Sequence, residues 1–290
     1  MTRFMEGLKE AFIPAILIVV VPTTILGFLL SGSGNLMLLA EAIVLIILAD
    51  ISANVINNYA DWHIDVFNEK RNAMHSIFER QHLLFMYGAL LLVLYSLMFI
   101  IRANFYLISS VSIFVILGVL YSVGTKLKDR VFLNYLTIAL AYAAVAASVG
   151  FFSGDGDVSA FLRWGPLLLF LVFVDLGYSM TKDYADIIGD KKHNKKTFPV
   201  MFGKSKAVRI QLTFITLAYA FLVTAVLEGV LSPVFMILLA SYVFAIYIVI
   251  MVHVTEDKEV HERMHFNSQR NGLMVRLIII VIMLIVYFNL

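Results

Sequence analysis

The sequence contains no cysteine among its 290 residues. This absence excludes disulfide bonds, thiolate metal ligands and cysteine nucleophiles. Charge is also scarce, because Asp, Glu, Lys and Arg make up 14% of the chain, against roughly 25% in an ordinary soluble domain. The net charge of +2 gives no case for nucleic acid as a partner.

Most residues of the chain are apolar. They account for 61% of it, with a mean hydropathy of +0.90. A helix needs about 20 apolar residues to cross a bilayer, and we find nine such runs, at about 11–31, 36–58, 83–101, 104–124, 133–152, 164–181, 207–227, 231–252 and 272–290. The sequence therefore predicts an all-α membrane protein. We expect one polytopic domain, 1–290, with nine transmembrane helices around a central cavity that opens near the cytoplasmic face.

The positions of Lys and Arg predict the orientation of the chain. With a cytoplasmic N-terminus, 19 of the 22 basic residues fall in cytoplasmic segments, as the positive-inside rule requires. Arg102 and Arg163 fall outside, and Arg276, in the last run, is expected to snorkel to the interface. The predicted location is the cell membrane, with the C-terminus outside and membrane lipids as surroundings. Nothing in the sequence implies an obligate protein partner.

The segment 57–65 ends the second apolar run and reads Asn-Asn-Tyr-Ala-Asp-Trp-His-Ile-Asp. It places Asn57, Asp61 and Asp65 four residues apart, so on a helix their side chains follow one face over roughly 12 Å. Stacked carboxylates repel each other and lose hydration unless a cation lies between or opposite them. A divalent metal ion is the predicted partner.

A second stripe with the same spacing follows the sixth run. Lys182, Asp186 and Asp190 each lie 125 positions after the corresponding member of the first stripe, and Tyr178 precedes them by four residues. Asp183 precedes Asp186 by three residues and Asp190 by seven, so on a helix the three carboxylates would share one face. We therefore interpret the two stripes as halves of one site and 182–190 as a weak internal duplication of 57–65.

Other polar residues have alternative interpretations. Asp50 and Asp175 lie within apolar runs, where a carboxylate is expected to face the bundle interior. His261 and His265 have a metal-capable spacing, but no carboxylate partner is placed beside them. The basic residues near the stripes either form solvated salt bridges and topology anchors or neutralise an anionic substrate; they are Arg71, Lys126, Lys128 and Lys182.

Paired acidic helix ends surrounded by cations suit an amphiphilic ligand with an anionic head and a long apolar chain. Carboxylates repel a diphosphate unless they act through bound Mg²⁺, which prefers oxygen ligands and bridges carboxylates to phosphate oxygens. Metal ions and basic residues stabilise departing diphosphate when an allylic carbon–oxygen bond breaks. The allylic cation left behind requires a site without water.

These motifs resemble those of the UbiA superfamily of intramembrane prenyltransferases. The family's first motif reads Asn-Asp-x-x-Asp-x-x-x-Asp, and Asn58 stands here where many members have Asp. The second reads Asp-x-x-x-Asp ahead of Thr-x-Pro-Val, which matches 186–190 and 197–200. Tyr178 and Lys182 match a Tyr-x-x-x-Lys element, and Tyr121-Ser with Lys-Leu-Lys at 126–128 resembles the segment after the fourth helix. The sequence after Arg71 departs from the Arg-Pro-x-Pro-Ser-Gly of many relatives.

The resemblance implies transfer of an isoprenyl chain, such as geranylgeranyl, from its diphosphate to a hydrophobic or phosphate-bearing acceptor, with release of diphosphate, in quinone or archaeal ether-lipid synthesis. It implies two Mg²⁺ ions bridged by the diphosphate. The implied metal ligands are Asn57, Asp61, Asp65, Asp186 and Asp190. Arg71, Lys126, Lys128 and Lys182 would contact the diphosphate, Tyr121 and Tyr178 would stabilise the cation or orient the acceptor, and Asn58 and Asp183 would support the ligands.

Two other classes remain as alternatives. An ion-coupled secondary transporter would use Asp50, Asp175 and the stripes as a cation pathway, although most of the acids lie at the ends of runs. A phosphotransferase for alcohol lipids would also use metal-binding aspartates, but its Asp-Gly-x-x-Ala-Arg signature is missing.

Overall fold

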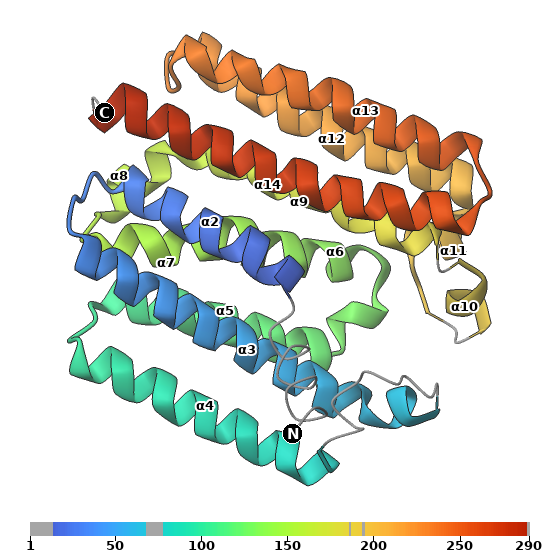
Figure 1. Ribbon diagram of the computed structural model, residues 1–290, viewed down its shortest axis with the longest axis horizontal. Coiled ribbons are helices and arrows are strands. Elements are labelled where there is room, and N and C mark those ends of the chain that lie inside the picture. The colour runs from blue at the N-terminus through green and yellow to red at the C-terminus, as the bar shows by residue number, and fades with distance from the viewer. Residues whose placement is uncertain (1–13, 68–77, 186, 193–194, 289–290) are drawn as a thin grey trace.

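The computed structural model describes residues 14–67, 78–185, 187–192 and 195–288 (Figure 1), and this part of the chain is helical with no strand. The longer helices are α2 (Pro14–Leu30), α3 (Leu36–Phe67), α4 (Arg80–Ile100), α5 (Phe105–Ser122), α9 (Gly165–Ser179), α12 (Lys204–Leu227), α13 (Leu239–Val254) and α14 (Lys258–Phe288). The shorter ones are η2 (Leu127–Asp129), α6 (Val131–Ala139), the π-helical η3 (Leu140–Val145), α7 (Ala146–Ser153), α8 (Val158–Arg163), η4 (Met180–Tyr184), α10 (Ile187–Lys192), α11 (Phe198–Phe202) and η5 (Pro233–Leu238).

The helices form the bundle of a multi-pass membrane protein. Eight helical segments of the described chain are long and apolar enough to cross a membrane, and the apolar part of α2, Ile18–Leu30, is shorter. This agrees with the predicted fold class, with the count of nine approximate. Large apolar side chains point outward, such as Phe85 and Phe99 of α4, which are 79% and 85% exposed. Such a surface suits contact with lipid.

The long helices lie side by side, with α4 at one edge and α12 and α13 at the other (Figure 1). The C-terminal end of α3, which carries the first stripe, and the short helix α10, which follows η4, lie at the same end of the bundle (Figure 1). We call this the motif end. The turn between α7 and α8 lies at the opposite end.

The helices α2 and α7 pack closely because both carry glycine at their contact. A Cβ on Gly27 would lie 1.9 Å from the Ala147 carbonyl oxygen, and one on Gly150 would lie 1.9 Å from the Thr24 carbonyl oxygen. No side chain fits at such distances. Small side chains permit close helix approach, and Ala146 and Ala147 at this contact are both buried.

The second stripe does not lie on one continuous helix, so this part of the sequence interpretation is wrong. The helix α9 ends at Ser179, the 3-10 helix η4 follows, and α10 begins only at Ile187. Spacing of four residues therefore places Tyr178, Lys182 and Asp190 on three different helical segments. Lys182 is exposed while Asp190 is only 4% exposed, which fits the break.

Arg276 does not snorkel to the interface, contrary to the sequence expectation. It is completely buried, and its Nη2 lies 2.7 Å from Asp175 Oδ2. Arg276 Nε also donates to Thr23 Oγ1 at 2.6 Å. A buried charge is tolerated when it is paired and hydrogen-bonded, so this contact joins α14, α9 and α2. The expectation that Asp175 faces the interior is confirmed.

Candidate active site

The first stripe meets the chain that follows α5. Asn57 Oδ1 accepts hydrogen bonds from Ser122 Oγ and from Lys128 Nζ, each at 3.1 Å. Lys128 Nζ also lies 2.6 Å from Asp61 Oδ1. Two oxygen atoms one helical turn apart on α3 thus converge on a single cation, as the four-residue spacing predicts.

The turn after α5 explains how Lys128 reaches α3. Gly124 and Lys126 both adopt positive φ angles, 66° and 43°, and the chain reverses into η2. Glycine takes this conformation without cost, whereas Lys126 is one of a few non-glycine residues that do so. Lys126 itself is exposed, whereas Lys128 contacts Asn57 and Asp61 of the first stripe.

Asn58 is turned away from this cluster. Its Nδ2 donates to the Asn54 carbonyl oxygen at 2.9 Å, a backbone contact within α3. Asn54 Nδ2 in turn lies 3.5 Å from Oδ2 of Asp50, which is 3% exposed. The polar face of α3 therefore continues from the first stripe into the bundle, where the sequence predicted Asp50 to lie.

Asp183 is held by a tyrosine that the sequence analysis did not single out. The Tyr135 hydroxyl donates to Asp183 Oδ2 and accepts from the Phe198 backbone N–H at 3.3 Å. The Tyr135 ring stacks on Phe198 with centroids 5.1 Å apart. Tyr135 sits inside an apolar run, and no sequence spacing relates it to the acidic segment. One buried ring thus joins α6, η4 and the start of α11.

Asp190 lies nearby in α10 and is buried. Lys195 Nζ lies 3.3 Å from Asp190 Oδ1, and the Lys195 backbone N–H donates to the Asp190 carbonyl oxygen at 2.9 Å. Thr197 Oγ1 is buried and has no hydrogen-bond partner within the described residues. A buried polar atom without a hydrogen-bond partner lowers the stability of a protein. The Thr197 hydroxyl can therefore donate to or accept from a ligand next to the second motif.

Tyr121 lies within electrostatic range of an aspartate from each acidic segment. It lies at the end of α5, within electrostatic range of both Asp61 on α3 and Asp183 on η4. These two aspartates are far apart in the sequence, and a single side chain lies close to both. The two acidic segments thus lie at the motif end (Figure 1), with Tyr121 within electrostatic range of one aspartate from each.

Three of the candidate residues cannot be placed. Arg71 and Asp186 lie outside the described residues, as does the side chain of Asp65, whose backbone belongs to α3. Tyr178 is placed and is buried, and its hydroxyl hydrogen-bonds Tyr219 and accepts from Asn271 Nδ2. Its suggested contact with an allylic cation stays a prediction.

The oxygen donors at the first motif fit a hard metal ion. Mg²⁺ takes oxygen ligands from carboxylates and amide carbonyls, and Asn57 Oδ1 and Asp61 Oδ1 already face one cationic nitrogen. Within the described residues no group of three His, Cys, Asp or Glu side chains gathers as a metal site. Both ring nitrogens of His261 face backbone carbonyl oxygens, so they are not available to a metal.

A family model described as the UbiA prenyltransferase family matches residues 20–269. The chain belongs to the UbiA prenyltransferase family. This confirms the resemblance stated from the motifs and favours prenyl transfer over an ion-coupled transporter or a lipid phosphotransferase. The matched range includes the acidic segments, Lys128 and Tyr121.

Two curated UbiA relatives are similar in sequence. A digeranylgeranylglyceryl phosphate synthase of Methanosphaera stadtmanae is 30% identical over 166 residues, which cover 57% of this chain and 58% of that protein. An enzyme of the same description from Methanobrevibacter smithii is 24% identical over 220 residues, or 73% of this chain and 74% of that protein. The first alignment therefore spans less than two thirds of that relative.

Solved structures share the UbiA fold. A structure described as digeranylgeranylglyceryl phosphate synthase superimposes with a TM-score of 0.71 at 20% identity, covering 97% of this chain and 98% of that one. A UbiA homologue of Archaeoglobus fulgidus bound to DMAPP and Mg²⁺ gives a TM-score of 0.70 at 15% identity, covering 94% of this chain and 99% of the other. At these identities the likeness shows the fold.

Proposed function

We propose that this UbiA protein transfers a geranylgeranyl chain from its diphosphate to a glyceryl phosphate that already carries one such chain. The product would be the digeranylgeranylglyceryl phosphate named in the description of both archaeal relatives. The observation that supports a prenyl diphosphate site is the convergence of Asn57, Asp61 and Lys128, with Tyr121 close to Asp61 and to Asp183. This arrangement offers oxygen ligands and a cation at one place.

The first motif would hold metal through Asn57, Asp61 and Asp65, and the second through Asp186 and Asp190. Bound Mg²⁺, which we propose as two ions bridged by the diphosphate, would neutralise the charge of the departing diphosphate. Lys128 would then have a phosphate oxygen as its partner, and Arg71, Lys126 and Lys182 would add further positive charge. Lys126 and Lys182 are exposed, so both are free to meet a ligand that arrives from solution.

The reaction replaces one carbon–oxygen bond with another. The bond between C1 of the prenyl chain and the diphosphate oxygen breaks, the electron pair leaves with the diphosphate, and the glyceryl hydroxyl oxygen forms the new bond to C1 and loses its proton. Charge developing at C1 requires a site that excludes water. Tyr121 and Tyr178 are the aromatic side chains that we assign to contact or orientation at this step.

The direct test is an assay with purified protein, Mg²⁺ and geranylgeranyl diphosphate, with the monoprenylated glyceryl phosphate and aromatic acids offered as separate acceptors. We expect the diprenylated glyceryl phosphate, identified by mass, with release of diphosphate. Formation of a prenylated aromatic ring alone would refute the glyceryl acceptor while keeping prenyl transfer. If no product forms with any acceptor and the protein instead conducts ions in liposomes, the assignment as a prenyltransferase would be refuted.

We also propose that the motif end faces the cytoplasm, with the N-terminus on that side and the C-terminus outside. The distribution of Lys and Arg supports this orientation, since eight basic residues lie between Lys182 and Arg209. Labelling of single cysteines introduced at 126 and 155 in intact cells would test it, because the natural chain has no cysteine. Labelling of position 126 from outside would contradict the orientation.

A further inference from the structure

The last helix, α14, is joined to the segment that carries the second motif by three buried polar contacts. Arg276 pairs with Asp175, Asn271 Nδ2 donates to the Tyr178 hydroxyl, and His261 Nδ1 lies 3.1 Å from the Tyr184 carbonyl oxygen. The order is antiparallel, because residues that come later in α14 meet residues that come earlier in α9 and η4. We call these contacts the α14 ladder.

The α14 ladder fixes the position of α9 and η4 along α14. Its three α14 residues, His261, Asn271 and Arg276, are 2%, 2% and 0% exposed. They extend over 15 residues of one helix, or roughly 22 Å. If α9 and η4 moved together by one turn along α14, all three would lose their partners at once, and each unpaired buried polar group is costly.

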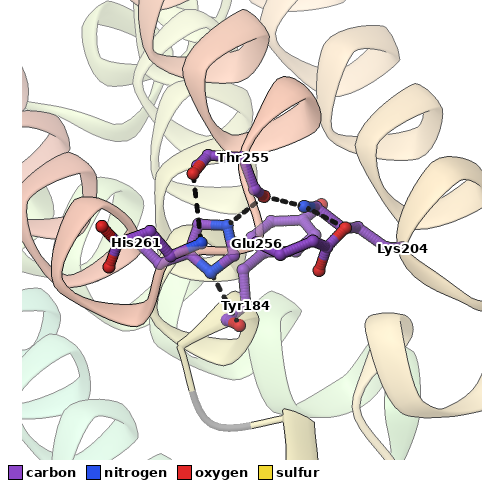
Figure 2. A network of polar contacts seen from close by, with 6 residues as sticks. Tyr184, Lys204, Thr255, Glu256 and His261 are labelled. Atoms are coloured by element: carbon purple, nitrogen blue, oxygen red, sulfur yellow. Dashed lines mark hydrogen bonds and ion pairs between the residues drawn. The ribbon is translucent and has the colours of Figure 1, made fainter.

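His261 contacts Tyr184, which is nearer in the sequence to the second motif than the other ladder partners, and Figure 2 shows this contact. Its second ring nitrogen, Nε2, lies 3.0 Å from the Thr255 carbonyl oxygen, so both nitrogens face acceptors. A neutral imidazole donates from one nitrogen, whereas the imidazolium donates from both. His261 can therefore tie Tyr184 at the end of η4 to the loop that precedes α14.

Charged neighbours complete the contact around His261 (Figure 2). The Lys204 ammonium donates to the same Thr255 carbonyl oxygen and lies 2.9 Å from Glu256 Oε1. Glu256 thus places a carboxylate beside the Lys204 ammonium. The Tyr184 ring lies against the imidazole with centroids 6.3 Å apart. His261 thus contacts η4 and the 255–257 loop, and the same Thr255 carbonyl oxygen also accepts from Lys204 of α12.

We propose that His261 is a positioning residue for the second aspartate motif. By holding the Tyr184 carbonyl it fixes η4, whose Asp183 accepts a hydrogen bond from Tyr135, and η4 precedes the second motif in the chain. The α14 ladder therefore sets the height of the second motif along α14, and so the place from which this motif would meet the diphosphate in the proposed function. His261 itself touches no reacting atom.

The test compares His261→Phe, which keeps a ring but loses both ring nitrogens, with His261→Gln, which keeps one donor group. The matched control is His253→Phe at the end of α13, where the histidine is exposed. Hydrogen exchange is measured by mass spectrometry on the purified full-length protein. We expect faster exchange in peptides from 180–192 for His261→Phe, a smaller change for His261→Gln and none for the control, with α3 and α5 unchanged.

Kinetics supply a second readout, which rests on the proposed prenyl transfer. The Mg²⁺ concentration for half-maximal rate should rise roughly threefold to tenfold in His261→Phe, the factor for one lost hydrogen bond, while kcat at saturating Mg²⁺ changes little. A fall in kcat without a change in Mg²⁺ dependence would overturn the positioning role.

Two further outcomes separate the hypotheses. Unchanged hydrogen exchange at 180–192 would overturn the proposal, because His261 would then not stabilise this segment. Faster exchange throughout the bundle in both His261 variants would also overturn it, because His261 would then stabilise the whole fold. A wild-type protein without transferase activity, in which the local exchange effect still appears, would refute the proposed function and leave the positioning role intact. If His261→Phe does not fold, Lys204→Met, which removes the other donor to Thr255, replaces it.

Discussion

Lys128 Nζ lies 2.6 Å from Asp61 Oδ1, although the two residues belong to different helical segments, η2 and α3. Both side chains are mostly buried, at 15% and 25% exposure. An ion pair screened from water is stronger than one on the surface. The contact therefore fixes the turn after α5 against the first stripe, and the predictions below start from it.

Asp61→Asn should lower prenyl transfer by roughly 100-fold or more, because it removes a carboxylate that we assign to metal binding at the departing diphosphate. The amide is nearly the same size, so the bundle should stay folded. Initial rates at saturating Mg²⁺ and circular dichroism would check both points. Asp155→Asn, at the opposite end of the bundle, is the control, and a rate near wild type in Asp61→Asn would contradict the assignment.

Lys128→Met should lower kcat/KM for the prenyl diphosphate roughly tenfold to a hundredfold, the range for losing a hydrogen bond to a charged group. It leaves Asn57 and Asp61 without their shared cation. The rate is measured across a series of diphosphate concentrations. Lys206→Met changes an exposed lysine on α12 and should have no effect. Equal behaviour of the two variants would rule out a role for Lys128 in binding diphosphate.

Tyr135→Phe should destabilise the protein by about 1.5 kcal/mol or more, because Asp183 and the Phe198 N–H both lose a partner inside the structure. We expect a lower rate as well, since η4 is released on one side. Thermal unfolding in detergent and the rate assay would measure the two effects. Tyr247→Phe, at a 46% exposed position, is the matched control, and unfolding at the same temperature in both variants would disprove the predicted effect.

Arg276→Met should destabilise the bundle strongly, by about 3 kcal/mol or more, because it leaves Asp175 buried without a cation. The double variant Arg276→Met with Asp175→Leu removes both charges and should recover much of that loss. A double-mutant cycle on unfolding free energies measures the coupling. Additive effects of the two single changes would show that the pair has no net coupling.

Glu256 provides a test at the edge of the α14 ladder. The Lys204 ammonium, which hydrogen-bonds it at 2.9 Å, holds the pKa of this carboxyl below its ordinary value. A depressed folded-state pKa means that the contact stabilises the fold above the ordinary glutamate range and is lost as the pH falls through the folded-state pKa. Lys204→Met should therefore raise the pKa of Glu256, measured by NMR of ¹³C-labelled glutamate. An unchanged pKa would contradict the contact.

Local sequence patterns were sufficient for the membrane class, the helical fold and the first stripe. The length of an apolar run predicts a transmembrane helix because a bilayer has a fixed thickness. A four-residue spacing predicts a shared helical face, and this holds for the first stripe because α3 is one continuous helix through Phe67. The family motifs pointed to the same residues. Each of these features depends on residues that are close together in the sequence.

The sequence by itself determined that this is a helical membrane protein of the UbiA type with acidic segments at the ends of its spans. Only the tertiary structure decided that α9 gives way to η4, that Arg276 pairs with Asp175, and that Tyr135 and His261 hold the two sides of η4. Each of these features depends on partners from distant parts of the chain. Sequence spacing carries no information about such contacts, because packing of the helices creates them.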